Sequence, residues 1–323
     1  MLKQIGVAST RAAVLGTTFF LLCQAVPAHA QVRKLHTRDL ARLSQLQVAE
    51  YLKQKDIVFI PVGAVETNGI MPSDRDYVTP LAYCMTAAEE LGALYMPGLI
   101  WSYPGTTLIA SSTVYLPPSA GAAYVKLIAK SLLRQGFRRQ VWISSGQGPA
   151  PLTVGTMVRE FFDEMHVPIL YVDMGALLPK LNLKLSEEAR SRTIYGSHYI
   201  AGRIEDLPLK GDYGPEAGSI ESNAPRNEGL ATLSKLGYSG SLFLGSWIPN
   251  VMAHGGGARE QVLPANSAER EEWGRQGKEV ILTIVKGMKL TEALDALQKH
   301  DKFTQEHIIP KHSSILPVPA DQR

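Results

Sequence analysis

Short apolar runs alternate with longer segments of helical periodicity along this chain, and this alternation constrains the fold more than any other feature. The apolar runs are residues 56–61, 93–96, 140–143 and 168–172, and the helical patterns are residues 80–91, 119–135, 152–165 and 269–287. Strands that are joined through helices pair in parallel, and helices then cover both faces of the sheet. The sequence therefore predicts a single three-layer α/β domain with a mainly parallel sheet.

The composition excludes several other classes of protein. Of the 323 residues, 45% are apolar and 20% are charged, which is typical of a chain with a large core and not of a disordered or fibrous one. Two cysteines are too few for a disulfide scaffold or a cysteine-based zinc site. Basic residues do not cluster with aromatic ones in the sequence, so we expect no nucleic-acid partner.

The first 30 residues have the three parts of a secretory signal peptide. Lys3 and Arg11 are their only charges, residues 12–26 are apolar, and residues 27–30 end in an A-x-A site. A membrane anchor is the alternative, but the apolar stretch is shorter than the roughly 20 residues that a spanning helix needs. We expect cleavage after Ala30, no membrane anchor in the mature protein, and a periplasmic or secreted location in a bacterium.

The rest of the chain shows no composition break that would mark a second domain. We therefore expect one domain over residues 31–309. Residues 310–323 are Pro-rich and polar, which indicates a C-terminal surface extension.

Polar residues cluster after two of the predicted strands, where ligands bind in parallel sheets. Residues 63–76 carry Glu66, Asn68, Asp74 and Asp76, and carboxylates so close in sequence repel one another unless they share a cation or a proton. The alternative is a solvated acidic loop in which Arg75 neutralises a neighbour. Residues 144–150 form a Gly-rich turn before a helix, without the third glycine of a dinucleotide site or the lysine of a Walker loop.

Together these segments resemble the creatininase family of metal-dependent amidohydrolases. The family signature P-x-G-x-x-E-x-H-G-x-H-L-P-x-x-x-D is matched by Pro61, Gly63, Glu66, Gly69, Pro72 and Asp76. Residues 102–107 resemble its P-G-T element, residues 135–148 its G-F-R-R and N-G-H-G-G-N elements, and residues 217–222 its H-A-G-x-x-E-T-S box. The order and spacing agree across roughly residues 55–225, so the resemblance implies a creatininase-like fold.

The resemblance implies a site with two metal ions, but the expected histidines are absent. Three candidate metal ligands match the family pattern, namely Glu66, Asp76 and Glu221. Asn68 and Gln147 stand at two ligand-histidine positions, Glu216 stands at the histidine of the last box, and Met71 lies where the second histidine of the first segment belongs. On this basis Asn68 is a fourth candidate metal contact, while Gln147 and Glu216 are candidate catalytic residues, with Glu216 as a proton carrier.

The loss of imidazoles has two interpretations. Imidazole suits zinc, whereas carboxylate and amide oxygens suit Mg²⁺, Ca²⁺ or Mn²⁺, so the site is either retuned to a harder cation or has lost its metal. His198 or His254 could reach the site from a loop and replace a lost imidazole; the alternative is a packing or surface role. The segment after His254 resembles a lipase oxyanion loop, but the sequence has no G-x-S-x-G motif, which argues against a serine hydrolase.

The sequence thus supports two hypotheses about function. In the first, the chain is a periplasmic amidohydrolase that hydrolyses the C–N bond of a small-molecule amide, with a divalent Mn, Mg, Ca or Zn ion as a possible cofactor. In the second, it is a non-catalytic ligand-binding protein, or pseudoenzyme, of the same fold. The lost histidines and the export signal argue against creatinine as the substrate, and the resemblance implies a homo-oligomer.

Overall fold

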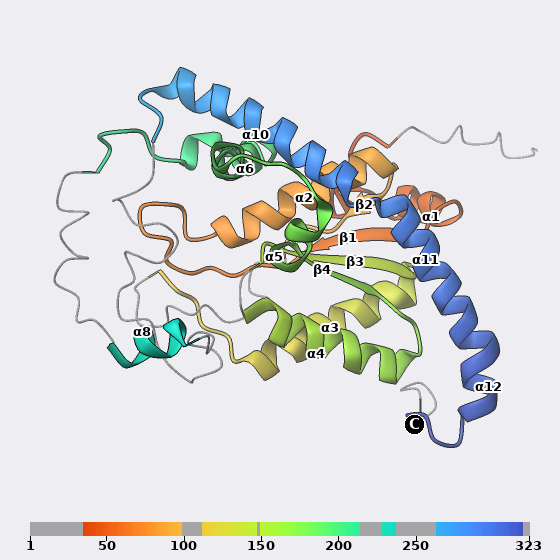
Figure 1. Cartoon of the computed structure of the whole chain (residues 1–323). Helices are drawn as coiled ribbons and strands as arrows, with labels where there is room; N and C mark the ends of the chain where they lie inside the picture. The colour runs from red at the N-terminus through yellow and green to blue at the C-terminus, as the bar shows by residue number, and fades with distance from the viewer. Residues whose placement is uncertain (1–34, 99–111, 147–148, 214–227, 237–262, 319–323) are drawn as a thin grey trace, which may run out of the picture. The chain divides into compact units, whose positions relative to one another are not determined.

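A computed structural model describes residues 35–98, 112–146, 149–213, 228–236 and 263–318 (Figure 1). The chain divides into two compact units, Met1–Leu35 and His36–Arg323. Every element named below belongs to the second unit. Within the described residues, no helix is both long and apolar enough to cross a membrane.

The described residues form a parallel four-stranded sheet in the order β2-β1-β3-β4. Its strands are β1 (Ile57–Pro61), β2 (Leu94–Tyr95), β3 (Arg139–Ser144) and β4 (Leu170–Asp173). All five residues of β1 are buried, as expected for a central strand of a sheet that is covered on both faces. The predicted α/β class with a parallel sheet is confirmed. From β1, the next strand in sequence (β2) lies on one side and β3 on the other, so the strand order reverses between β1 and β3.

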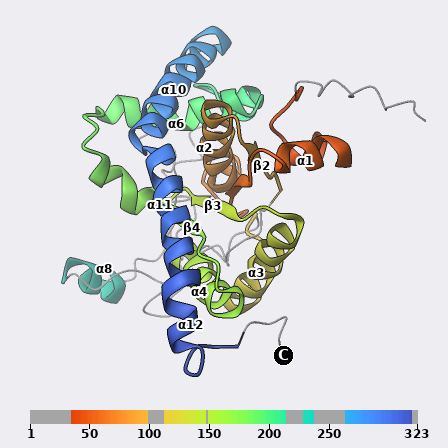
Figure 2. The same cartoon turned by 90° about the vertical axis from the view of Figure 1, so that its right-hand side faces the viewer.

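Helices cover the sheet on two sides. Their bounds are α1 (Gln45–Leu52), α2 (Arg75–Leu91), α3 (Pro118–Gln135), α4 (Pro149–Met165), α5 (Met174–Leu177), α6 (Glu187–Ile200), α8 (Glu228–Lys235), α10 (Ser267–Gly287), α11 (Leu290–Phe303) and α12 (Ile309–His312). Short 3-10 turns are η1 (Leu40–Arg42), η2 (Leu178–Leu181) and η3 (Ile204–Asp206), and η4 (Thr304–Ile308) is a π-helical turn. In both views α2, α6 and α10 lie on one side of the sheet and α3 and α4 on the other (Figures 1 and 2).

The main apolar core joins the sheet to α2 and α10. Phe59 and Ile143 of the sheet share it with Cys84 of α2 and Ile281 of α10, and all four are fully buried. Burial raises the pKa of the Cys84 thiol well above its usual value. Cys84 is therefore a core residue and not a nucleophile.

All four predicted helices begin earlier than the sequence pattern indicates, α10 by two residues and α4 by three. Helix α2 begins at Arg75, five residues before Pro80, which the sequence pattern marks as the start. Helix α3 begins at Pro118, one residue before the predicted start, because proline is well suited to the first helical position. The predicted stop at Gly136 is confirmed by its left-handed backbone, with φ at 107°.

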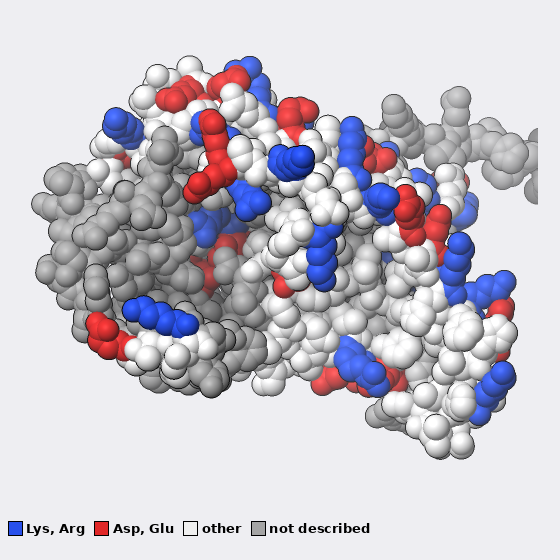
Figure 3. Space-filling model, viewed as in Figure 1, with Lys and Arg blue, Asp and Glu red and all other residues white. Residues whose placement is uncertain are grey.

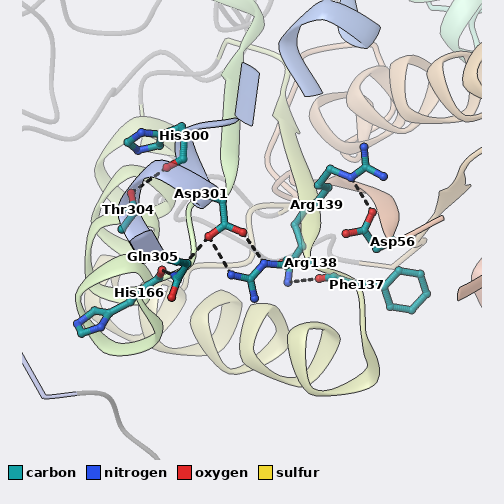
Figure 4. Close-up of polar contacts among 10 residues, drawn as sticks. Asp56, Phe137, Arg138, Arg139, His166, His300, Asp301, Thr304 and Gln305 are labelled. Atoms are coloured by element: carbon teal, nitrogen blue, oxygen red, sulfur yellow. Dashed lines mark hydrogen bonds and ion pairs between the residues drawn. The ribbon is translucent and has the colours of Figure 1, made fainter. Parts of the chain in front are cut away.

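The C-terminal helices are attached to the body of the fold by polar contacts (Figure 4). Arg138, directly before β3, makes a two-point ion pair with Asp301 of α11, in which its Nη2 donates to Oδ1 at 2.8 Å. Gln305 Nε2 donates to the backbone oxygen of His166 at 2.6 Å, and His166 Nε2 lies 2.8 Å from the oxygen of Pro317. Helix α12 crosses the predicted boundary at residue 310, so the tail continues a helical segment that returns to the domain.

We expect Asp301→Asn to lower the free energy of unfolding by about 1–2 kcal/mol, because it removes the charge from a paired, partly buried carboxylate. Chemical denaturation in urea measures this change. Asp295→Asn, at an exposed position of the same helix, is the matched control and should change stability by less than about 0.5 kcal/mol. Equal losses in the two variants would show that the ion pair contributes nothing specific.

Candidate functional site

The candidate site lies where the sheet order reverses, at the carboxyl ends of β1 and β3. Parallel doubly wound sheets open a crevice at such a reversal, because the loops on its two sides run to opposite faces. Pro61 and Ile143 are partners in the two strands, and Val62 N donates to the oxygen of Ile143 at 2.9 Å. The β1–α2 loop and the β3–α4 turn therefore start side by side. Figure 3 shows acidic and basic side chains gathered in a hollow near this end of the sheet.

The β1–α2 loop folds back on itself and on α2. Glu66 N donates to the oxygen of Ser73 at 2.9 Å, and Met71 N donates to the oxygen of Asn68 at 3.1 Å. Gly63 lies against the first turn of α2, where an added Cβ would be only 2.5 Å from Tyr77 Cα. Only glycine fits such a close backbone approach. The backbone of this loop is thus fixed at both ends and in the middle.

The β1–α2 loop and the first turn of α2 bury three residues that the sequence nominates as metal contacts. Glu66 is 0% exposed, Asn68 1% and Asp76 3%. Asn68 Nδ2 lies 3.2 Å from the backbone oxygen of Glu66 and 3.4 Å from Asp76 Oδ2, and both partners are acceptors. The alternative of a solvated acidic loop is therefore wrong for these residues, although Arg75 does approach Asp76, with its Nε 3.8 Å from Oδ1.

A backbone carbonyl of α2 joins the two halves of the site, because Pro80 leaves it without its usual helical donor. An α-helix normally satisfies the oxygen of Asp76 with the N–H four residues later, but that residue is Pro80, which has no N–H. Ser145 Oγ, from the turn after β3, lies 3.5 Å from this oxygen. The first turn of α2, which carries Asp76, therefore contacts the β3–α4 turn directly.

The β3–α4 turn is shaped by a close approach of two backbones. Gly146 has φ at 98°, and an added Cβ would be 2.5 Å from the nitrogen of Gly175 at the start of α5. Ser144, just before the turn, shares a 2.9 Å hydrogen bond with the hydroxyl of Tyr171, whose pKa is raised chiefly by burial. These contacts fix the direction in which the chain leaves β3 toward Gln147.

Several candidate residues lie outside the described part of the chain. These are Gln147, Glu216, Glu221 and His254. Their proposed roles remain predictions. The P-G-T segment, residues 102–107, also lies outside the described residues.

His198 is a helical residue, which contradicts the expectation that it approaches from a loop. It lies in the last turn of α6 and is 0% exposed, and its Nδ1 is 3.0 Å from the oxygen of Ile194 in the same helix. Burial lowers its pKa, so the neutral ring is favoured near neutral pH. No described residue bonds to its Nε2. The ring is therefore fixed by its own helix, in the manner of a packing histidine.

The buried donor set fits a hard cation in its chemistry. Glu66 and Asp76 supply carboxylate oxygens. Asn68 Oδ1 is buried, and no described residue donates a hydrogen bond to it. Oxygen donors of this kind bind Mg²⁺, Ca²⁺ or Mn²⁺. Among the described residues, no group of three or more His, Cys, Asp or Glu side chains is placed to hold a metal. The described part of the site thus provides two carboxylates and an amide, and further donors would have to come from elsewhere.

Two residues that contact this site, Ser145 and Arg203, were not predicted from the sequence. Ser145 had a local signal, because a proline four residues after Asp76 leaves a helical carbonyl in need of a donor. Arg203 had none. It is 129 residues from Asp74, with which it forms an ion pair, and only the fold brings the two together.

Comparisons with known proteins point to one family. The model of the family described as creatininase, creatinine amidohydrolase, matches residues 41–205. This match includes the first two candidate segments and ends before residues 216–222.

Individual relatives carry the same description. A creatinine amidohydrolase from Pseudomonas putida is 35% identical over 98 residues, which are 26% of this chain and 35% of that protein, so the match spans about a third of the relative's length. A crystal structure of creatinine amidohydrolase is 16% identical, covers 82% of this chain and 98% of that one, and has a TM-score of 0.49. A structure named "Creatininase Mn" is 17% identical with the same coverage and TM-score.

Proposed function

Because the chain belongs to the creatininase family, we propose that it is an amidohydrolase that breaks the C–N bond of a small-molecule amide at the β1–β3 edge of its sheet. The observation that carries this proposal is the burial of Glu66 and Asn68 of the β1–α2 loop together with Asp76 of the first turn of α2, whose Oδ2 lies 3.4 Å from Asn68 Nδ2. Two carboxylates and an amide oxygen are the kind of donors that bind a hard divalent cation, and such a cation supplies the Lewis acid that amide hydrolysis uses.

In this proposal the chain binds a hard divalent cation through oxygen donors. Glu66, Asp76 and Asn68 Oδ1 would hold it, and Glu221 is the further carboxylate that the family pattern nominates. A bound cation of this type polarises a carbonyl oxygen and lowers the pKa of a bound water. Mn²⁺, Mg²⁺ and Ca²⁺ suit these donors better than Zn²⁺ does.

The remaining residues of the site orient these donors. The Asn68 amide nitrogen, 3.4 Å from Asp76 Oδ2, orients the carboxylate of Asp76. Ser145 fixes the backbone oxygen of Asp76 and so the first turn of α2. Glu216 is the candidate proton carrier for the leaving nitrogen, provided that burial raises its pKa, and Gln147 is a candidate contact to the substrate.

The proposal also covers where the protein is located and whether it forms oligomers. The leader sequence supports a periplasmic or secreted enzyme that is released by cleavage after Ala30, and its substrate would then be a molecule available outside the cytoplasm. The family supports a homo-oligomer.

Arg75 favours a second candidate function, that of a ligand-binding pseudoenzyme. Its guanidinium lies 3.8 Å from Asp76, and both side chains are largely buried. A fixed positive charge next to one of the two carboxylates offsets part of the charge that a metal would otherwise balance. In this case the site would bind a ligand without hydrolysing it.

Metal analysis of the purified mature protein separates the two functions. For an enzyme we expect about one or two equivalents of a divalent metal per chain. A chelator should lower hydrolysis of a panel of small cyclic and linear amides by at least about 100-fold, and Mn²⁺ should restore it. A protein that contains no metal and hydrolyses none of the panel with any divalent ion would contradict the enzymatic function.

A further inference from the structure

The candidate site loop is tied to a distant part of the chain by an ion pair. Arg203, which directly precedes η3, donates from Nη1 to Asp74 Oδ2 at 2.5 Å and from Nη2 to Asp74 Oδ1 at 3.3 Å. Asp74 lies two residues before Asp76, and its side chain is 17% exposed. A two-point pairing of this kind fixes the orientation of a carboxylate as well as its position.

Arg203 is itself held from two other directions. Its Nε donates to Asp206 Oδ2 at 2.7 Å, and its backbone nitrogen donates to the oxygen of His198 at 2.7 Å. The three contacts fix both the backbone and the planar guanidinium. Arg203 is therefore an anchored group rather than a freely moving surface side chain.

Asp74 occupies the N-cap of α2 but makes no capping hydrogen bond with its side chain. An aspartate at this position normally uses its carboxylate to cap the first turn. Here the carboxylate binds Arg203, while the backbone oxygen of Asp74 accepts from Tyr77 N at 2.8 Å and Val78 N at 2.9 Å. The side chain is thus used to place the first turn of α2, and that turn carries Asp76.

An apolar contact also holds the β1–α2 loop against α6 and α10. Met71 is 5% exposed and packs in an apolar cluster with Tyr195 of α6 and Trp273 of α10. Helix α6 also packs against α2, as Figures 1 and 2 show from two sides. The segment from α6 to η3 therefore holds the loop both before and at its junction with α2.

We propose that Arg203 is a positioning residue for the candidate site, holding Asp74 so that Asp76 and Asn68 keep their relative placement. Its guanidinium also balances the charge of Asp74 and so reduces the repulsion between Asp74 and Asp76. A role of this arrangement in cation binding depends on the proposed function, whereas the positioning of Asp74 by Arg203 is independent of it.

The positioning is tested by hydrogen exchange on the full mature chain, without any added ligand. In Arg203→Met we expect the backbone amides of residues 66–78 to exchange at least about 10-fold faster, while those of residues 139–144 stay unchanged. Arg203→Lys should recover part of the protection, because it keeps the charge but loses the two-point geometry. The control is Arg159→Met, a largely exposed arginine on α4, which should alter neither segment. Unchanged exchange in residues 66–78 would overturn the proposal.

Titration with Mn²⁺ then tests the link to the site. If the proposed function holds, Arg203→Met should weaken Mn²⁺ binding by about 10–100-fold while Arg159→Met leaves it unchanged. Faster exchange with an unaltered Mn²⁺ affinity would overturn the claim that Arg203 positions the donors. A wild-type protein that binds no Mn²⁺ would contradict the proposed cation site, and the exchange result would then decide the positioning role by itself.

Discussion

Gly277→Ala is expected to destabilise the protein by at least about 3 kcal/mol and to leave much of it unfolded at 37 °C. Gly277 lies in α10 where this helix crosses α6. A Cβ at this position would be 1.9 Å from the oxygen of Arg192 and 2.6 Å from the nitrogen of Gly196. These neighbours are backbone atoms of another helix, so no side-chain rotation can relieve the overlap.

The effect is expected to reach beyond the crossing. Gly196 faces Gly277 in the same way, since a Cβ on Gly196 would be 2.2 Å from the carbonyl carbon of Gly277. The two helices can accept an extra methyl group only by moving apart, which would open the apolar cluster of Tyr195 and Trp273. Because Met71 packs in that cluster, the same movement would loosen the candidate site loop.

Chemical denaturation followed by circular dichroism measures the change in stability. Gly155→Ala in α4 is the matched control, because an added Cβ there meets nothing within 4 Å. It should raise stability by about 0.5–1 kcal/mol, since alanine favours helices over glycine. A Gly277→Ala protein as stable as the wild type would show that the two helices do not cross this closely in solution.

The sequence predicted the sheet well because its strands are buried on both faces. The run at residues 56–61 contains only apolar residues after Asp56 and became β1, and the order of strands and helices led directly to a parallel sheet. The family motif placed Glu66 and Asp76 in the segment after that strand, where the structure has Glu66 on the loop and Asp76 in the first turn of α2.

Features that depend on distant contacts were not predictable from local patterns. Helix α6 was missed because its sequence is mostly polar and includes Gly196, whose close approach to α10 can be recognised only in the fold. Helix α2 starts before Pro80, although proline usually marks a helix boundary. The carbonyl of Asp76, which Pro80 cannot bond through an N–H, is contacted by Ser145 Oγ instead. Arg203 carries no motif at all, and its partner Asp74 was seen only as one more acidic residue.

Glu66→Gln is expected to remove divalent-cation binding and to lower amide hydrolysis by about 1,000-fold, if the proposed function holds. The change keeps the shape of the side chain and removes its charge. Glu66 is 0% exposed, so in the absence of a cation the substitution removes the cost of keeping a charged group away from water. The metal-free variant should therefore be at least as stable as the metal-free wild type, although it has lost its activity.

Thermal unfolding with and without Mn²⁺ tests whether Glu66→Gln loses cation binding without losing stability. Saturation at about 100 times the dissociation constant should stabilise the wild type by about 2.7 kcal/mol, because the cation binds only the folded chain, and it should leave Glu66→Gln unchanged. Glu271→Gln, at an exposed position of α10, is the control and should respond to Mn²⁺ as the wild type does. If Mn²⁺ stabilised Glu66→Gln and the wild type equally, the cation would bind elsewhere. A metal-free Glu66→Gln protein clearly less stable than the metal-free wild type would instead assign Glu66 a structural role, since the buried carboxylate would then be stabilised by the protein itself.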